Sequence, residues 1–187
     1  MGNNSTDRAR LRVRLPVARP PLDIGAPSFT LDGPLRGRVV GLRYEASGTS
    51  WPFIVAEWQR FLRDDGAVPD VLLAKGRSGG QRDRIRKDVR NWARRVDCGV
   101  SGLGTCGSFT SDSVSDAVVL ERLRRPAVVA VCREFEAHAR NMASFLGHPS
   151  LKILVLPYPV EGRTADELRD MAAEYYPRFV ELLGATP

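Results

Sequence analysis

The chain has 187 residues, 43% of them hydrophobic, and a formal net charge of +6 at pH 7. This length is typical of one domain with its own core, and no apolar run approaches the roughly 20 residues that cross a bilayer. The two histidines and three cysteines lack the spacing of metal ligands and leave an odd thiol, so we expect no metal site and no disulfide framework. Together with the lack of a secretory signal, this composition predicts a cytoplasmic protein.

The first 36 residues are rich in proline and show no sustained hydrophobic period. We expect this segment, residues 1–36, to be a leader that is partly disordered or packs on the edge of a single domain, residues 37–187. The positive charge is uneven, because residues 1–20 carry five Arg against one Asp and residues 75–95 carry nine basic against two acidic side chains. Such asymmetry favours anionic partners.

From residue 38 onward, short apolar runs alternate with segments of helical spacing. The short runs predict strands at 38–44, 68–75, 97–104, 127–132 and 151–157. The spaced segments predict helices at 51–66, 82–95, 111–124, 134–147 and 164–183. Thr164 and Glu167 also predict a capping box at the start of the last helix.

Five strand–helix units in this order predict an α/β fold. We expect a single domain with one mostly parallel five-stranded sheet, flanked by helices in a flavodoxin-like topology. Ligands bind such folds in the loops beyond the carboxyl ends of the strands. The candidate site residues are therefore sought in those loops.

Residues 102–107, GLGTCG, match the G-x-G-x-x-G pattern that cradles a dinucleotide pyrophosphate. That pattern belongs after the first strand and needs an acidic residue about 20 positions later. Here it follows the third predicted strand, and residues 126–130 read PAVVA. We therefore interpret the match as accidental.

The same stretch places Cys106 between a predicted strand and a predicted helix. Unpaired N–H groups and the positive end of the helix dipole at such a position stabilise a thiolate. Gly107 gives the backbone freedom to turn, and Ser108, Thr110 and Ser111 supply hydroxyl donors for the thiolate or for a substrate. An inert cysteine buried beside a capped helix is the alternative.

Residues 97–121, DCGVSGLGTCGSFTSDSVSDAVVLE, resemble the signature of the UGSC-motif family. That family is named for a selenocysteine-Gly-Ser-Cys tetrad, and many members carry cysteine at its first position. Here the tetrad is Cys106-Gly107-Ser108-Phe109, and residues 156–172 resemble the family's Pro-x-Pro segment and final helix. The resemblance implies one lobe of an Asp/Glu racemase-like α/β protein, a group that uses cysteine thiols on a parallel sheet.

The chain departs from this family pattern at two positions. Phe109 replaces the second thiol of the tetrad, which excludes a local C-x-x-C redox pair and offers an aromatic wall for a substrate pocket. Ser115 stands where histidine is common in the family, so an imidazole base is missing there. Cys98 begins the strand that Cys106 follows, more than about 20 Å away, and we expect Cys98 to be a core residue.

Other candidate residues lie near the ends of the predicted strands. Cys132 ends the fourth strand, which neighbours the third in a flavodoxin-like order, so Cys132 either approaches Cys106 or packs in the core. Asp112 is a candidate acid or base, with complementation of the helix dipole as the alternative. Further substrate contacts are expected from Tyr44, Ser47, Thr49, Lys75 and Tyr158.

The basic helix 82–95 is interpreted as a solvated face, with attraction of an anionic substrate as the alternative. The sequence carries no RNP motif, helix-turn-helix spacing or interleaved aromatic residues, so we expect no nucleic-acid partner. His138 falls in the middle of a predicted helix, where we expect a surface or packing role.

These observations predict an enzyme that uses Cys106 as a thiolate nucleophile or base on a small molecule. We expect an isomerase/lyase or thiol-transfer type of reaction on a small anionic or electrophilic metabolite, with no cofactor and no membrane; a homodimer stays open. Two alternatives remain. One is a thiol redox protein using Cys106, with or without Cys132; the other is a non-catalytic module with an anion site at the helix N-terminus after Cys106.

Overall fold

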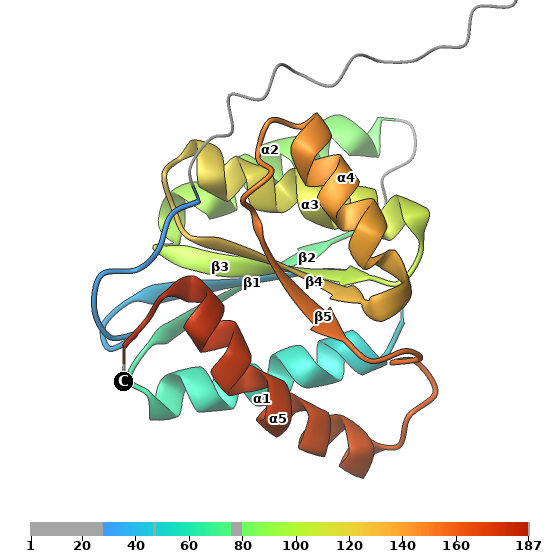
Figure 1. Cartoon of the computed structure of the whole chain (residues 1–187). Helices are drawn as coiled ribbons and strands as arrows, with labels where there is room; N and C mark the ends of the chain where they lie inside the picture. Colours follow the sequence, from blue (N-terminus) through green and yellow to red (C-terminus); the bar gives the residue numbers. More distant parts are fainter. Residues whose placement is uncertain (1–27, 47, 76–79, 187) are drawn as a thin grey trace, which may run out of the picture.

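The computed structural model describes residues 28–46, 48–75 and 80–186, and its centre is a five-stranded sheet (Figure 1). The strands are β1 (Val39–Glu45), β2 (Val68–Ala74), β3 (Cys98–Gly104), β4 (Ala127–Cys132) and β5 (Lys152–Leu156). All neighbouring strands pair in parallel, in the order β2-β1-β3-β4-β5. This is the flavodoxin-like order, so the predicted fold class is confirmed.

Helices cover both faces of the sheet, as parallel strand–helix units require. The helices are α1 (Ser50–Asp64), α2 (Gln81–Arg95), α3 (Gly107–Arg122), α4 (Glu136–Phe145) and α5 (Ala165–Leu183), with a short 3₁₀ turn, η1 (Arg133–Phe135). Helices α1 and α5 lie on one face, and α2, α3 and α4 lie on the other (Figure 1). Strands β3 and β4 are therefore buried along their whole length, which explains the uninterrupted apolar sequence of β4 and the small and apolar residues of β3.

Aromatic side chains contribute to the packing on both faces of the sheet. Between α1 and α5, the rings of Trp58 and Phe179 stack with centroids 4.9 Å apart, and the indole N–H of Trp58 donates to the carbonyl of Ala172 at 2.9 Å. On the opposite face, Trp92 of α2 lies against Gly41 of β1. A Cβ at Gly41 would stand 2.4 Å from the Trp92 ring, so only glycine lets α2 approach this closely.

The starts of α5 and α3 can be compared with those predicted from the sequence. The predicted capping box is present, since the Thr164 side chain accepts from the Glu167 N–H and Glu167 accepts from the Thr164 N–H. Helix α3, however, begins at Gly107, four residues before the predicted Ser111. Cys106 itself is the N-cap there, with its sulfur accepting from the Phe109 N–H.

The described part of the expected leader, residues 28–36, packs against the end of α5. Leu35 is buried in the core, the Leu31 N–H donates to the Leu183 carbonyl at 2.7 Å, and Pro34 forms a bridge with Thr186. The rest of the expected leader, residues 1–27, lies outside the described residues. Among the described helices, none is both long and apolar enough to cross a membrane.

Candidate active site

Cys106 lies at the carboxyl edge of the sheet, between the end of β3 and the first turn of α3. Its Sγ is 3.2 Å from the Ser108 hydroxyl and accepts a hydrogen bond from the Phe109 N–H at 3.5 Å. The side chain is partly exposed. Cys106 therefore combines access from solvent with donors that point at its sulfur, which are two requirements of a reactive thiol.

The environment of Cys106 lowers the pKa of its thiol. Desolvation and the charge of Asp112 raise this pKa, but hydrogen bonds from the Ser108 side chain and from the Phe109 and Ser108 backbone outweigh them. The first turn of α3 supplies all of these donors. The thiolate is therefore stabilised by the local fold of residues 106–109.

The other two cysteines lie in a different environment. Cys98 and Cys132 are fully buried in the core beneath α1 and α5. Burial raises the pKa of the Cys98 thiol to about 12 and that of the Cys132 thiol to about 11. As expected, β3 and β4 are neighbours, but Cys132 faces the core. Its predicted catalytic role, and a disulfide with Cys106, remain predictions that this burial does not favour.

Thr110, Gly104 and Gly107 surround Cys106, and each has a different structural role. Thr110 is buried and donates to the Cys106 carbonyl at 2.7 Å, so it stabilises the turn and is not available to a substrate. A Cβ at Gly104 would lie 2.6 Å from the Thr110 hydroxyl oxygen, whereas one at Gly107 would meet nothing within 4 Å. Close packing therefore requires glycine at Gly104 and leaves Gly107 exposed at the helix start.

His138 of α4 reaches the first turn of α3, which the sequence did not predict. Its Nε2 lies 2.9 Å from the Ser111 hydroxyl and 3.1 Å from the Gly107 carbonyl oxygen. Ser111 in turn donates to the same Gly107 carbonyl at 2.8 Å. The imidazole therefore contacts Gly107, the residue after Cys106, although His138 comes 32 positions after Cys106 in the sequence.

Phe109 lines a cavity of about 120 Å³ beside the cysteine turn. Its lining includes Thr105 and Phe109, which flank Cys106 in sequence, and Trp51 of α1. Two carboxylate residues, Glu45 and Glu161, also line this cavity. The cavity thus combines two aromatic side chains with two acidic ones, and Cys106 itself is not among its lining residues.

Glu161 is held at the N-terminus of α1. Its Oε2 accepts from the Thr49 N–H at 3.2 Å, the Ser50 N–H at 3.4 Å and the Ser50 hydroxyl at 3.1 Å. A helix N-terminus stabilises such a negative charge. Thr49, predicted to bind substrate, is thus engaged by Glu161. A Cβ at Gly48 would lie 2.3 Å from Glu161 Oε1, so glycine allows this loop to approach the carboxylate.

A buried charge cluster lies behind the cavity. Arg43 of β1 is fully buried and forms ion pairs with Glu45 and with Asp116 of α3, the latter at 2.7 Å. Its NH1 also lies 3.4 Å from the Gly102 carbonyl and from the Ser113 hydroxyl. This cluster ties β1, β3 and α3 together and orients Glu45 at the cavity.

The remaining predicted site residues are more scattered. Asp112 is half-buried on the side of α3 that faces α2. Tyr44 packs against the core, and Tyr158 is exposed. Ser47 lies outside the described residues. Of the three described residues, Asp112, Tyr44 and Tyr158, Asp112 alone has a resolved electrostatic effect on Cys106.

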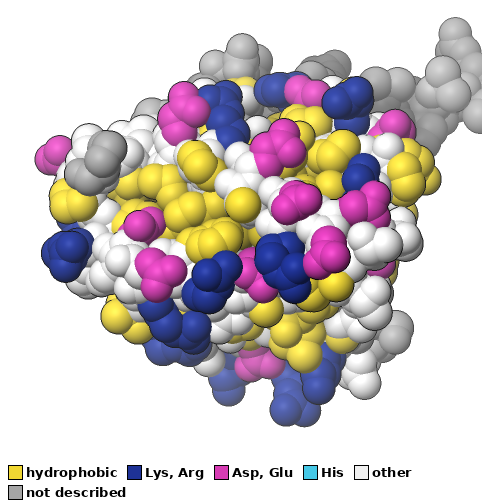
Figure 2. Space-filling model, turned by 90° about the horizontal axis from the view of Figure 1, so that it is seen from below, with side chains coloured by type: hydrophobic (Ala, Val, Ile, Leu, Met, Phe, Trp, Pro, Cys, Tyr) yellow, Lys and Arg dark blue, Asp and Glu magenta, His cyan; other side chains and the backbone are white. Residues whose placement is uncertain are grey.

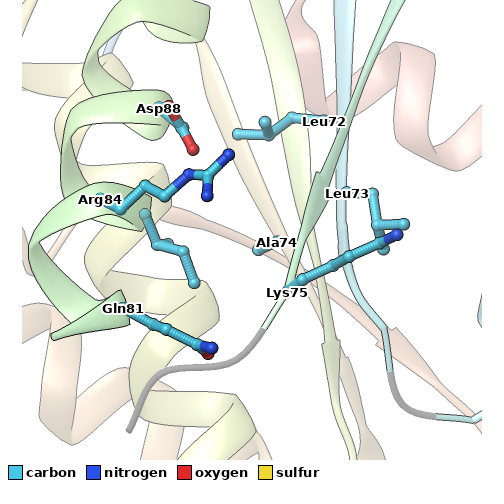
Figure 3. Close-up of a pocket in the computed structure, with 8 residues that line it drawn as sticks. Leu72, Leu73, Ala74, Lys75, Gln81, Arg84 and Asp88 are labelled. Carbon is cyan, nitrogen blue, oxygen red and sulfur yellow. The ribbon is translucent and has the colours of Figure 1, made fainter. Parts of the chain in front are cut away.

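Lys75 follows β2 and belongs to a different cavity, of about 330 Å³, between β2 and α2 (Figure 3). Its side chain extends away from α2, whereas Gln81 and Arg84 approach the cavity from the helix (Figure 3). Because β1 separates β2 from β3, Lys75 is about 10 Å from the cysteine strand in the plane of the sheet. The structure therefore does not bring Lys75 to the cysteine turn.

Four residues of this region were not predicted: Arg43, Glu45, His138 and Glu161. Arg43 and Glu45 lie in a strand that otherwise reads as apolar, and a charged pair two positions apart in such a strand was the available signal. The positions of His138 and Glu161 depend on how distant elements pack. Among the described residues, no group of three or more His, Cys, Asp or Glu could hold a metal ion.

Comparison with protein families identifies the chain. The family model of the UGSC family matches residues 13–185. The protein belongs to the UGSC family. The match covers nearly the whole chain, including the Cys106 turn and the segment of Glu161. The further likeness of this UGSC protein to Asp/Glu racemases remains a prediction.

A solved structure from Ralstonia solanacearum, described as a "putative D-3-phosphoglycerate dehydrogenase oxidoreductase", is similar to this chain at 15% sequence identity and a TM-score of 0.37. The similarity covers 80% of this chain and 49% of the other, so the chain spans about half the length of that protein. No curated protein matches the sequence.

Proposed function

We propose that this UGSC protein is an enzyme that uses the Cys106 thiolate to transform a small molecule at the carboxyl edge of the sheet. The observation that carries the proposal is the first turn of α3, whose donors lower the pKa of a partly exposed thiol. A buried structural cysteine has no need of such donors. We propose that the substrate occupies the cavity lined by Thr105 and Phe109, which lie on either side of Cys106 in the sequence.

Two related chemical steps fit this arrangement. As a nucleophile, the sulfur lone pair forms an S–C bond to an electrophilic carbon, and the π electrons of that carbon's double bond move to the distal atom. As a base, the thiolate takes a proton from carbon, and the C–H electrons remain on the substrate. In both cases the proposed role of the N-terminus of α3 and of the Ser108 hydroxyl, 3.2 Å from the sulfur, is to stabilise the negative charge.

The lining of the cavity bears on the kind of substrate. Glu45 and Glu161 bring two carboxylates to it, and the charge of Glu45 is balanced by Arg43. A volume of about 120 Å³ accommodates the reactive part of a small metabolite. The expected anionic group of the substrate is therefore disfavoured inside this cavity, and we propose a neutral or cationic electrophilic centre there.

The three free cysteines agree with a reducing, cytoplasmic location, which we propose for the protein.

The test is the pH dependence of iodoacetamide alkylation at each cysteine, resolved by peptide mass spectrometry. We expect Cys106 to react with a midpoint below that of a free thiol. Cys98 and Cys132 serve as internal controls, since both are fully buried and should react only after unfolding. Cys106→Ser should remove the fast reaction and leave the fold intact.

The proposal fails if Cys106 reacts no faster than a free cysteine at neutral pH, or no faster than the two buried cysteines. If the low midpoint is found, the same Cys106→Ser variant becomes the control for a screen of small electrophiles. Saturable protection of Cys106 from alkylation then identifies compounds that occupy the adjacent cavity.

A further inference from the structure

A row of arginines runs along the side of α2 that faces α3. Arg82, Arg86, Arg90 and Arg94 are spaced four residues apart, so they repeat about every 6 Å over about 18 Å of helix. Together with Arg122 of α3, they line a groove of about 480 Å³. We call this feature the arginine groove. The two helices lie side by side on one face of the sheet (Figure 1).

The guanidinium groups of the arginine groove are largely unpaired. Within the ranges that the structure describes, one ion pair is found for the five arginines, between Arg86 and the exposed Asp83 at 3.6 Å. Asp112 and Asp116 also line the groove, but Asp116 is paired with the buried Arg43. The groove therefore carries an excess of positive charge.

The arginine groove differs from the face of the molecule over α1 and α5. The surface over α1 and α5 carries basic and acidic side chains interspersed among apolar ones (Figure 2). The arginine groove, by contrast, is lined by five arginines together with the apolar side chains of Val89, Val119 and Leu123, which we call its apolar floor. If the basic side of α2 served only to keep the helix solvated, its arginines would not have to gather beside apolar side chains.

The dimensions and lining of the groove indicate the kind of anion that fits. Guanidinium groups bind phosphate oxygens with two parallel hydrogen bonds, and several in a row suit several phosphates. The volume of about 480 Å³ lies in the range of small-molecule sites. The lining contains no aromatic side chain, so it lacks the stacking surface that single-stranded nucleic acids use.

We propose that the arginine groove binds a small molecule carrying two or more phosphate groups, with its organic part on the apolar floor. Arg86 and Arg90 occupy the middle of the row and contact the phosphates. This site shares no lining residue with the cavity lined by Phe109. Binding is therefore independent of whether Cys106 is catalytic.

Isothermal titration calorimetry of the full chain tests the proposal, with ATP, inorganic tripolyphosphate and adenosine as probes in metal-free buffer. We expect both phosphate probes to bind, more weakly as salt increases because the groove is exposed, and adenosine not to bind. Arg86→Gln/Arg90→Gln should weaken binding at least tenfold. Arg84→Gln/Lys87→Gln is the matched control, because Arg84 faces β2 (Figure 3) and Lys87 does not line the groove.

Three results overturn the proposal: no heat from either phosphate probe at millimolar concentration, equal losses in the two double variants, or tight binding of a single-stranded oligonucleotide without triphosphate binding. Equal losses would mean that net charge, rather than the groove, attracts the anion. Cys106→Ser should bind both phosphate probes like the wild type, which separates this result from the test of the thiol.

Discussion

The Ser108 hydroxyl lies 3.2 Å from the Cys106 sulfur, in the same helical turn whose Phe109 N–H also points at that sulfur. Ser108→Ala removes this donor while leaving the exposed helix start otherwise unchanged. We expect the pKa of Cys106 to rise and its alkylation at neutral pH to slow about fivefold, as the loss of a hydrogen bond worth about 1 kcal/mol implies. Iodoacetamide kinetics between pH 6 and pH 9 measure both effects.

The control for this change is Ser115→Ala. Ser115 also lies in α3, but its hydroxyl donates to the Ser111 carbonyl at 2.7 Å, away from the sulfur. The pH profile of Cys106 alkylation in Ser115→Ala should match that of the wild type. An unchanged profile in Ser108→Ala would mean that the backbone donors alone hold the thiolate.

His138 joins α4 to the start of α3 through Ser111 and the Gly107 carbonyl. His138→Ala removes both contacts, and we expect the free energy of unfolding to fall by about 1 kcal/mol. Urea denaturation measures this change. Arg140→Ala is the control, because Arg140 is on the same helix and its ion pair with Glu136 is exposed and should contribute less than about 1 kcal/mol.

Alkylation of His138→Ala adds a second measurement. If the imidazole only fastens α4 to α3, the reactivity of Cys106 should follow the same pH curve as in the wild type. A shifted curve would show that His138 acts on the thiol and would make it a positioning residue for the proposed reaction.

The sheet could be predicted because its signals are local. Continuous apolar runs such as residues 127–132 identify buried parallel strands, and the alternation of strands and helices restricts the topology. The start of α3 was placed four residues late because the usual capping residues are Ser, Thr, Asp and Asn. Cys106 is the N-cap of α3 instead, and capping propensities do not indicate a cysteine at that position.

The candidate site was predicted only as far as it lies in one segment. Cys106, Ser108 and Phe109 are adjacent in sequence, so the motif located them together. His138 and Glu161 reach the same edge from later parts of the chain, through the packing of α4 on α3 and of the last loop on α1. Periodicity reports which face of a helix is buried, but not which neighbour that face meets.

Arg43 provides a prediction about the buried charge cluster. Arg43→Met leaves Glu45 and Asp116 without their shared cation in the interior, so we expect a loss of about 3–5 kcal/mol in the free energy of unfolding. Arg95→Met is the control, because its ion pair with Asp70 is at the surface and should be worth less than about 1 kcal/mol. Chemical denaturation compares the two, and similar losses would contradict a structural role for the cluster.

Glu121 of α3 gives the protein a pH-dependent stability. Burial raises the pKa of this carboxyl to about 7, although the backbone N–H groups of Ala127 and Phe29 and the charge of Lys152 act in the opposite direction. The native state therefore holds a proton that the unfolded chain releases near the ordinary carboxyl pKa of 4.5. This contribution is fully present below about pH 4.5 and is lost as the pH rises through about 7.

Glu121→Gln isolates this effect, since the amide cannot ionise. Between about pH 5 and pH 7, the stability of the wild type relative to this variant should fall by up to about 1.4 kcal/mol for each pH unit. Above pH 7 the difference should become constant. Urea denaturation at four pH values measures the trend, with the exposed Glu174→Gln as the control. A difference that does not change with pH would mean that Glu121 is ionised in the native protein throughout this range.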